Sequence, residues 1–203
     1  GTTVSVTIAN GDYGDTDTAA GNAIETTAGD LSVDTSANNN NQFIRETDGL
    51  TEVALLAGTG NVTALTVGTG DVLSADSAVD ITATTLNFTV TDGDFGDTDT
   101  AAGNAIETTV TDIAVDSSGN NGDQFIRETD GLAELLLAAG SGNVSLETTA
   151  AGDVLSADSA VDILGTTVSV TIADGDYGDT DTATGNAIET TAGDLSVDTS
   201  ANN

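Results

Sequence analysis

The sequence predicts an all-β fold, a parallel β-helix (β-solenoid) in which short coils of chain stack on one another. Three observations favour it: a repeat of fixed length, a shorter internal period, and short apolar–polar alternations bounded by Gly and Asn. A coil of about twenty residues cannot bury its own apolar face, so it must pack against neighbouring coils. Tandem Ig-like or cadherin-like β-sandwiches are the alternative, because the 82-residue repeat is close to the size of one such domain.

The 82-residue repeat recurs without insertion or deletion. The motif Gly-Asp-Tyr/Phe-Gly-Asp-Thr-Asp-Thr occurs at 11–18, 93–100 and 175–182. Residues 1–39 match 165–203 more closely than they match 83–121, so alternate repeats are the more alike. We expect one continuous solenoid over 1–203, whose sequence repeats are 1–82, 83–164 and the partial 165–203.

Variants of one phrase recur within a repeat length, at spacings of 20, 20, 18 and 24 residues. They are Ile106-Glu-Thr-Thr109, Ile126-Arg-Glu-Thr129, Leu146-Glu-Thr-Thr149, Leu164-Gly-Thr-Thr167 and Ile188-Glu-Thr-Thr191. We expect about four coils per repeat and about ten in the chain, paired in parallel at about 4.8 Å with Ile, Leu and Val side chains inward. On this register the acidic segments of successive repeats lie about 19 Å apart along the axis.

The same register makes a prediction about the two basic residues. If Ile106, Ile126 and Leu146 point inward, then the residue after each of them points outward and the three form a charge ladder. The ladder residues are Glu107, Arg127 and Glu147 in one repeat, and Glu25 and Arg45 in the other. An exposed ladder contributes about 0.5–1 kcal/mol, and it disfavours a slipped register in which carboxylates face each other.

The composition excludes several classes of function. Thirty-four acidic residues face two basic ones, a formal net charge of −32, which repels nucleic acid and attracts cations. The chain has no His, Cys or Lys, so the usual general bases and nucleophile pairs are missing. We therefore expect no enzyme, no catalytic residue and no nucleic-acid partner. No apolar run is long enough to span a membrane, so we expect no membrane insertion by this segment.

The acidic segment that recurs once per repeat is the candidate metal site. Each copy carries three Asp residues near two Gly residues: Asp12, Asp15 and Asp17, then Asp94, Asp97 and Asp99, then Asp176, Asp179 and Asp181. Carboxylates that converge where Gly lets the backbone fold back suit a hard cation, so Ca²⁺ is the candidate cofactor. The spacing matches neither the EF-hand nor the Gly-rich nonapeptide loop. The alternative is a solvated loop whose Asp side chains bond their own backbone.

Several of the recurring sequence phrases, taken with their flanking residues, resemble the repeats of a known group of proteins. The turns Asn104-Ala-Ile-Glu-Thr-Thr109, Gln124-Phe-Ile-Arg-Glu-Thr129 and Gly142-Asn-Val-Ser-Leu-Glu-Thr148 resemble the repeats of large bacterial surface proteins of the filamentous-haemagglutinin type. The resemblance implies an extracellular or cell-surface, prokaryotic protein, with this chain a structural segment of a long fibre, stalk or sheath. Its expected partners are other copies, along or between fibres, and divalent cations. An adhesin shaft that binds a partner with the help of Ca²⁺ is the second hypothesis, and a Thr-rich ice-binding face is the third.

Overall fold

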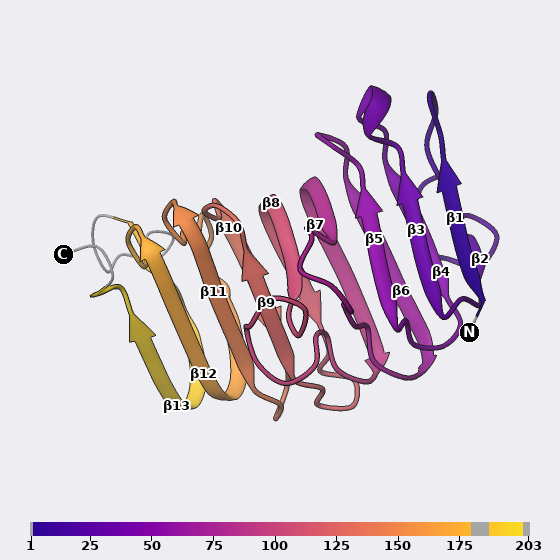
Figure 1. Ribbon diagram of the computed structural model, residues 1–203. Helices are drawn as coiled ribbons and strands as arrows, with labels where there is room; N and C mark the ends of the chain where they lie inside the picture. The colour runs from indigo at the N-terminus through magenta and orange to yellow at the C-terminus, as the bar shows by residue number, and fades with distance from the viewer. Residues whose placement is uncertain (1, 180–186, 201–203) are drawn as a thin grey trace.

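The computed structural model describes residues 2–179 and 187–200, and its chain forms a parallel β-solenoid of about eight turns (Figure 1). The predicted fold class is confirmed. The coils stand side by side along one axis, with the N-terminal strands at one end and the C-terminal strands at the other. In the described residues the strands are β1 (Thr3–Thr7), β2 (Ile24–Thr26), β3 (Asp30–Asp34), β4 (Gln42–Glu46), β5 (Glu52–Leu56), β6 (Val62–Thr69), β7 (Ile81–Asp92), β8 (Ile106–Asp116), β9 (Gln124–Glu128), β10 (Glu134–Ala138), β11 (Val144–Ala151), β12 (Ile163–Asp174) and β13 (Thr190–Asp198), and the 3₁₀ turn η1 covers Ser36–Asn38.

The strands pair in parallel and form two columns, which we call the first and the second sheet. The first sheet contains β1, β3, β5, the starts of β7 and β8, β9, β11, and the ends of β12 and β13. The second sheet contains β2, β4, β6, the ends of β7 and β8, β10, and the starts of β12 and β13. The four long strands pass directly from one sheet to the other, which makes the pairing continuous around the coil.

A single apolar core of aliphatic ladders lies between the two sheets. In the first sheet Leu31 pairs with Val53 on the next coil, and in the second sheet Ile44 pairs with Ala64. All four side chains are buried, whereas the residues between them along each strand are half-buried. This alternation follows from the period of two in a β-strand. A core this thin is filled by branched aliphatic side chains, as the near absence of aromatic residues requires.

Asn residues close the coils at equivalent positions of the two repeats. Asn39 and Asn121 adopt left-handed backbone angles, with φ of 55° and 59°, a conformation that Asn tolerates better than most residues. The Oδ1 atom of Asn39 accepts a hydrogen bond from Thr59 N at 2.9 Å, and that of Asn121 accepts one from Ser141 N at 3.0 Å. Each side chain therefore turns its own coil and binds the backbone of the next one.

One 82-residue repeat spans three and a half turns. From β1, three steps along the first sheet lead through β3 and β5 to the start of β7. The end of β7, at 86–90, then lies half a turn further on, in the second sheet. Because 86–90 is the counterpart of 4–8 at the 82-residue offset, equivalent residues of neighbouring repeats lie on opposite sheets. At twice this offset, at 168–172 in β12, the chain is back on the first sheet. The chain thus has fewer coils than the ten expected.

The half turn also separates the acidic segments. Connections that lead from the first sheet to the second form one side of the solenoid, which we call the first edge. Connections that lead from the second sheet back to the first form the opposite side, which we call the second edge. The segment 11–18 lies on the first edge, where Tyr13 pairs with Gln42. Its counterpart 93–100 lies on the second edge, where Phe95 pairs with Val72 and with Gln124. The expected line of acidic segments, spaced about 19 Å apart, is therefore wrong for neighbouring repeats, since only alternate repeats share an edge.

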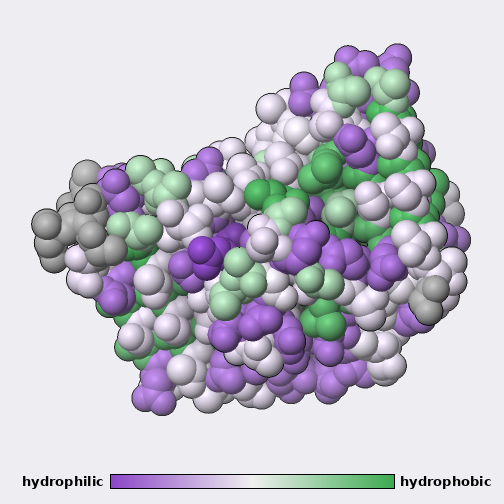
Figure 2. Space-filling view, in the orientation of Figure 1, coloured by the Kyte–Doolittle hydropathy of each residue, from purple (hydrophilic) through white to green (hydrophobic). Residues whose placement is uncertain are grey.

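The first edge changes in height along the solenoid. The connection that contains η1 rises above the N-terminal coils, whereas β7 and β8 turn from one sheet to the other without a loop (Figure 1). The outline of the molecule accordingly steps down from the N-terminal coils to the middle ones (Figure 2). Hydrophilic residues cover much of this face, with apolar patches between them.

Candidate metal centre

Four of the predicted Asp residues of the acidic segments, Asp12, Asp94, Asp17 and Asp99, accept hydrogen bonds from the backbone. Asp12 Oδ1 accepts a hydrogen bond from Asn41 N at 2.8 Å, which ties the segment to the next coil. In the second copy Asp94 Oδ1 accepts one from Asp123 N at 2.6 Å. Burial, followed by the charges of Asp71, Asp123 and Asp97, raises the pKa of Asp94, although hydrogen bonding to Asp123 N opposes this.

The third Asp of each segment closes a local turn. Asp17 Oδ1 accepts hydrogen bonds from Ala19 N and Asn22 Nδ2, at 2.8 and 3.1 Å. Asp99 Oδ1 does the same with Ala101 N and Asn104 Nδ2, at 2.8 and 3.0 Å. The hydrogen bonds to Ala101 and Asn104 lower the pKa of Asp99.

The remaining predicted Asp residues point to solvent. Asp15 and Asp97 are exposed, and their N–H groups donate to Asn22 O and Asn104 O. Asp176 and Asp179 are exposed too, and Asp181 lies outside the described residues. Within the described residues, none of the predicted Asp residues belongs to a set of three carboxylates close enough to share an ion.

The charge-ladder residues are register neighbours. Glu107 pairs with Arg127 and Arg127 with Glu147 on adjacent coils, and Arg127 Nη1 lies 3.1 Å from Glu147 Oε2. The same nitrogen donates to Thr100 O at 2.9 Å. Both side chains of this ion pair are about one-quarter exposed, so the pair contributes about 1 kcal/mol or less. Glu107 is not an exposed rung of this ladder, because loops cover it and leave it 5% exposed.

In the first repeat, Arg45 reproduces part of the arrangement around Arg127. Arg45 pairs with Glu25 on one side and with Leu65 on the other. Its Nη1 atom donates to Thr18 O at 3.1 Å, as Arg127 does to Thr100. In each repeat the arginine therefore holds the acidic segment against the sheet.

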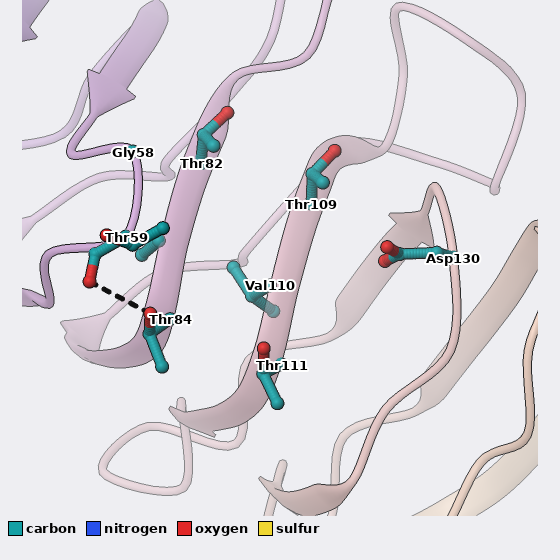
Figure 3. Close-up of a pocket in the computed structure, with 9 residues that line it drawn as sticks. Gly58, Thr59, Thr82, Thr84, Thr109, Val110, Thr111 and Asp130 are labelled. Carbon is teal, nitrogen blue, oxygen red and sulfur yellow. Dashed lines mark hydrogen bonds between the residues drawn. The ribbon is translucent and has the colours of Figure 1, made fainter. Parts of the chain in front are cut away.

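A hydroxyl-lined cleft of about 370 Å³ lies where β7 and β8 turn without a loop (Figure 3). Thr82 and Thr84 of β7 stand beside Thr109 and Thr111 of β8, and Thr82 is paired with Thr109 in the sheet. The one carboxylate in its lining is Asp130. The cleft offers polar contacts but no set of groups for catalysis.

Two further carboxylate groups, which sequence reasoning missed, come together at equivalent places. The first cluster is Glu52, Asp76 and Asp80, and the second cluster is Glu134, Asp158 and Asp162. In each cluster one carboxylate oxygen per residue lies within 4.8 Å of the others. The two clusters are one 82-residue repeat apart, and both could hold a metal ion.

Backbone and hydroxyl donors fix the carboxylates of the first cluster. Ala75 N donates to Glu52 Oε2 at 2.6 Å, and Ala78 N donates to Asp76 Oδ1 at 2.6 Å. Ser74 Oγ donates to Asp80 Oδ1 at 3.1 Å. The second cluster has the same three donors at the equivalent positions. Segments 71–81 and 153–163 are identical in sequence, and this identity is the signal that could have pointed to the clusters.

A fourth carboxylate adjoins each cluster. The Glu107 N–H donates to Asp80 Oδ2 at 2.7 Å, and Asp80 itself is 2% exposed. Burial, with a contribution from the Glu107 carboxylate, raises the pKa of Asp80 to about 8. Burial and Glu189 likewise raise the pKa of Asp162 to about 6. Burial is also the largest cause of the raised pKa of Glu52.

Glu128 is a buried carboxylate that belongs to neither cluster. It is fully buried and accepts hydrogen bonds from Thr108 Oγ1 at 2.6 Å and from Val110 N at 3.2 Å. Burial is the largest cause that raises its pKa from 4.5 to about 8.

The raised pKa of Glu128 predicts that stability falls as pH rises. Between about pH 4.5 and pH 8 the folded chain holds a proton that the unfolded chain has lost, so raising the pH favours unfolding. We expect a lower midpoint of thermal unfolding at pH 8 than at pH 5, measured with a chelator present. Glu128→Gln should make this dependence shallower, with Asp80 and Asp162 supplying the remainder, whereas Asp97→Asn, which removes an exposed charge, should leave it unchanged. Equal slopes for wild type and Glu128→Gln would contradict the assignment.

The fold and its sites define the chain as an acidic parallel β-solenoid with a carboxylate cluster in each full repeat. Within residues 2–179 and 187–200, no helix has the length and apolarity that crossing a membrane requires. No protein family matches the chain, and neither a curated protein nor a solved structure is similar enough to match it.

Proposed function

We propose that this chain is a structural segment of a very long extracellular repeat protein that forms a surface fibre, stalk or sheath, and that it is not an enzyme. The observation that carries the proposal is the continuity of the sheets across the repeat boundaries. Strand β7 runs through 82/83 and β12 through 164/165, and each pairs with coils of both adjoining repeats. Such a chain transmits load along hydrogen-bonded coils instead of through flexible linkers.

The charge of the chain fits an extended rod in a salty medium. A net charge of −32 keeps rods soluble and apart, and divalent cations can bridge them. We propose Ca²⁺ as this cation, since carboxylate oxygens are its preferred ligands, and other copies of the rod as partners. The resemblance to filamentous bacterial surface proteins supports a prokaryotic cell-surface location.

An adhesin shaft is the second candidate function, favoured by the cleft between β7 and β8. Its wall of threonine hydroxyls, with Asp130 at one side, suits a polar ligand such as a carbohydrate. At this cleft Thr-x-Thr pairs occur on two neighbouring coils, Thr82/Thr84 and Thr109/Thr111. Two coils form only a small threonine surface, so the cleft favours ice binding less than it favours a carbohydrate.

The rod proposal predicts how length grows with added repeats. Adding one 164-residue pair should add seven turns, and seven spacings of about 4.8 Å lengthen the particle by about 34 Å at constant cross-section. Small-angle X-ray scattering of the chain with and without this pair measures both quantities. A cross-section that varies along the particle, as in a string of beads, would argue against a rod. Antibody labelling of intact source cells then tests the surface location.

A further inference from the structure

We propose that each carboxylate cluster, together with the glutamate beside it, binds one hard divalent cation of the Ca²⁺ class. The first site comprises Glu52, Asp76, Asp80 and Glu107, and the second comprises Glu134, Asp158, Asp162 and Glu189. Both sites lie within one solenoid, so the inference goes beyond bridging between rods and does not depend on fibre formation.

The spacing of the cluster oxygens suits one shared ion. Oxygens bound to the same Ca²⁺ at 2.3–2.6 Å lie at most about 5 Å apart. The oxygens of Glu52, Asp76 and Asp80 already lie within 4.8 Å of one another. They come from different coils, Glu52 from β5 and the two Asp residues from the connection after β6. An ion here would therefore join neighbouring coils.

A second, independent observation comes from Glu107. Its Oε1 atom accepts a hydrogen bond from Gly103 N at 2.8 Å, whereas Oε2 is buried without a hydrogen-bond partner in the described part of the chain. The residue is 5% exposed and its backbone binds Asp80. A buried carboxylate oxygen without a partner is unfavourable, and a cation beside Asp80 would satisfy it. Oε2 of Glu189 in the second site is likewise buried without a partner.

The neighbouring basic residue does not neutralise the first site. Arg127 is the register neighbour of Glu107, but its Nη1 atom is bound to Thr100 O and lies near Glu147. The donors at the site, such as Ala75 N and Ser74 Oγ, fix carboxylate oxygens without adding a full positive charge. Asp80 and Glu107 are buried, Glu52 is half-buried and Asp76 is exposed at the mouth of the site. Charge balance for the buried carboxylates therefore requires protons or a cation, and carboxylate oxygens are the ligands that a hard cation such as Ca²⁺ prefers.

Calorimetric titration of the chelator-treated chain with Ca²⁺ alone tests the proposal. We expect two bound ions per chain and a higher midpoint of thermal unfolding with Ca²⁺. The double variant Asp80→Asn/Asp162→Asn should bind at least about tenfold more weakly. Without Ca²⁺ its unfolding midpoint should be unchanged or higher, because Asn has nearly the same size as Asp and adds no charge to the crowded group. Glu52→Gln/Glu134→Gln is an independent second variant in case the first fails to fold.

The matched control removes the same number of charges from the acidic segments, as Asp97→Asn/Asp179→Asn. This control should retain both ions. No Ca²⁺ binding by the wild type would overturn the proposal. Binding that survives in the cluster variants but is lost in the control would also overturn it, and would assign the ions to the acidic segments. Both outcomes leave the rod proposal standing, since scattering tests it separately.

Discussion

Replacing Phe88 by alanine is expected to lower the free energy of unfolding by about 3–5 kcal/mol, the usual cost of removing a buried aromatic ring. Phe88 is 2% exposed and lies in the second sheet between Ala64 and Val115 of the adjacent coils. Its ring packs against Phe95 with centroids 5.2 Å apart and an interplanar angle of 57°. The small Ala64 leaves room for the ring, and neither neighbour can move to fill the cavity without breaking the sheet pairing.

A matched control for this variant is Leu136→Ala. Leu136 is on β10, points outward and is 46% exposed, so its loss should change the free energy by about 0.5 kcal/mol or less. Denaturant unfolding followed by circular dichroism measures both values. Equal losses for the two variants would mean that the Phe88 ring does not fill a tightly packed core.

Replacing Gly96 by alanine is expected to cost about 3 kcal/mol, the sum of a strained backbone and a steric clash. Gly96 has a φ of +93°, and a Cβ atom there would lie 2.6 Å from Phe125 O and 2.8 Å from Phe125 Cβ. These atoms belong to the next coil, so relief of the clash requires the coils to separate.

Gly21→Ala isolates the backbone part of this cost. Gly21 has nearly the same φ, +92°, but a Cβ atom at this position would have nothing within 4 Å. We expect its replacement to cost about 1 kcal/mol, from backbone strain alone. The difference between the two variants in the free energy of unfolding then measures how closely the coils approach. A difference near zero would show that the stack is loose at Gly96.

The fold class could be predicted because its signals are local and repeated. The phrases at Ile106, Ile126 and Leu146 are evenly spaced in the sequence, and the structure pairs them as expected. The next phrase, at Leu164, was misleading: Leu164 pairs with Ala138 in the second sheet, and Leu146 pairs with Val170 instead. The connections between coils differ in length, so two phrases of similar sequence can lie in different sheets. The similarity of the phrases therefore does not show which sheet each one joins.

The clusters escaped prediction for the same reason. Glu52, Asp76 and Glu107 are far apart in the sequence, and only the stacking of three coils brings them together. The acidic segments were predicted as metal sites because their Asp residues are close in sequence. Asp side chains this close to turns bind nearby backbone N–H groups instead, as Asp17 and Asp99 do.

Three and a half turns per repeat relate neighbouring repeats by an approximate twofold screw axis along the rod. Duplication or loss of a single 82-residue repeat would transfer every later feature to the opposite side, whereas a change by two repeats would leave each feature where it was. Recombination that preserves the sides of the rod must therefore act on pairs of repeats. The closer likeness of 1–39 to 165–203 than to 83–121 is the pattern that such a parity rule would produce.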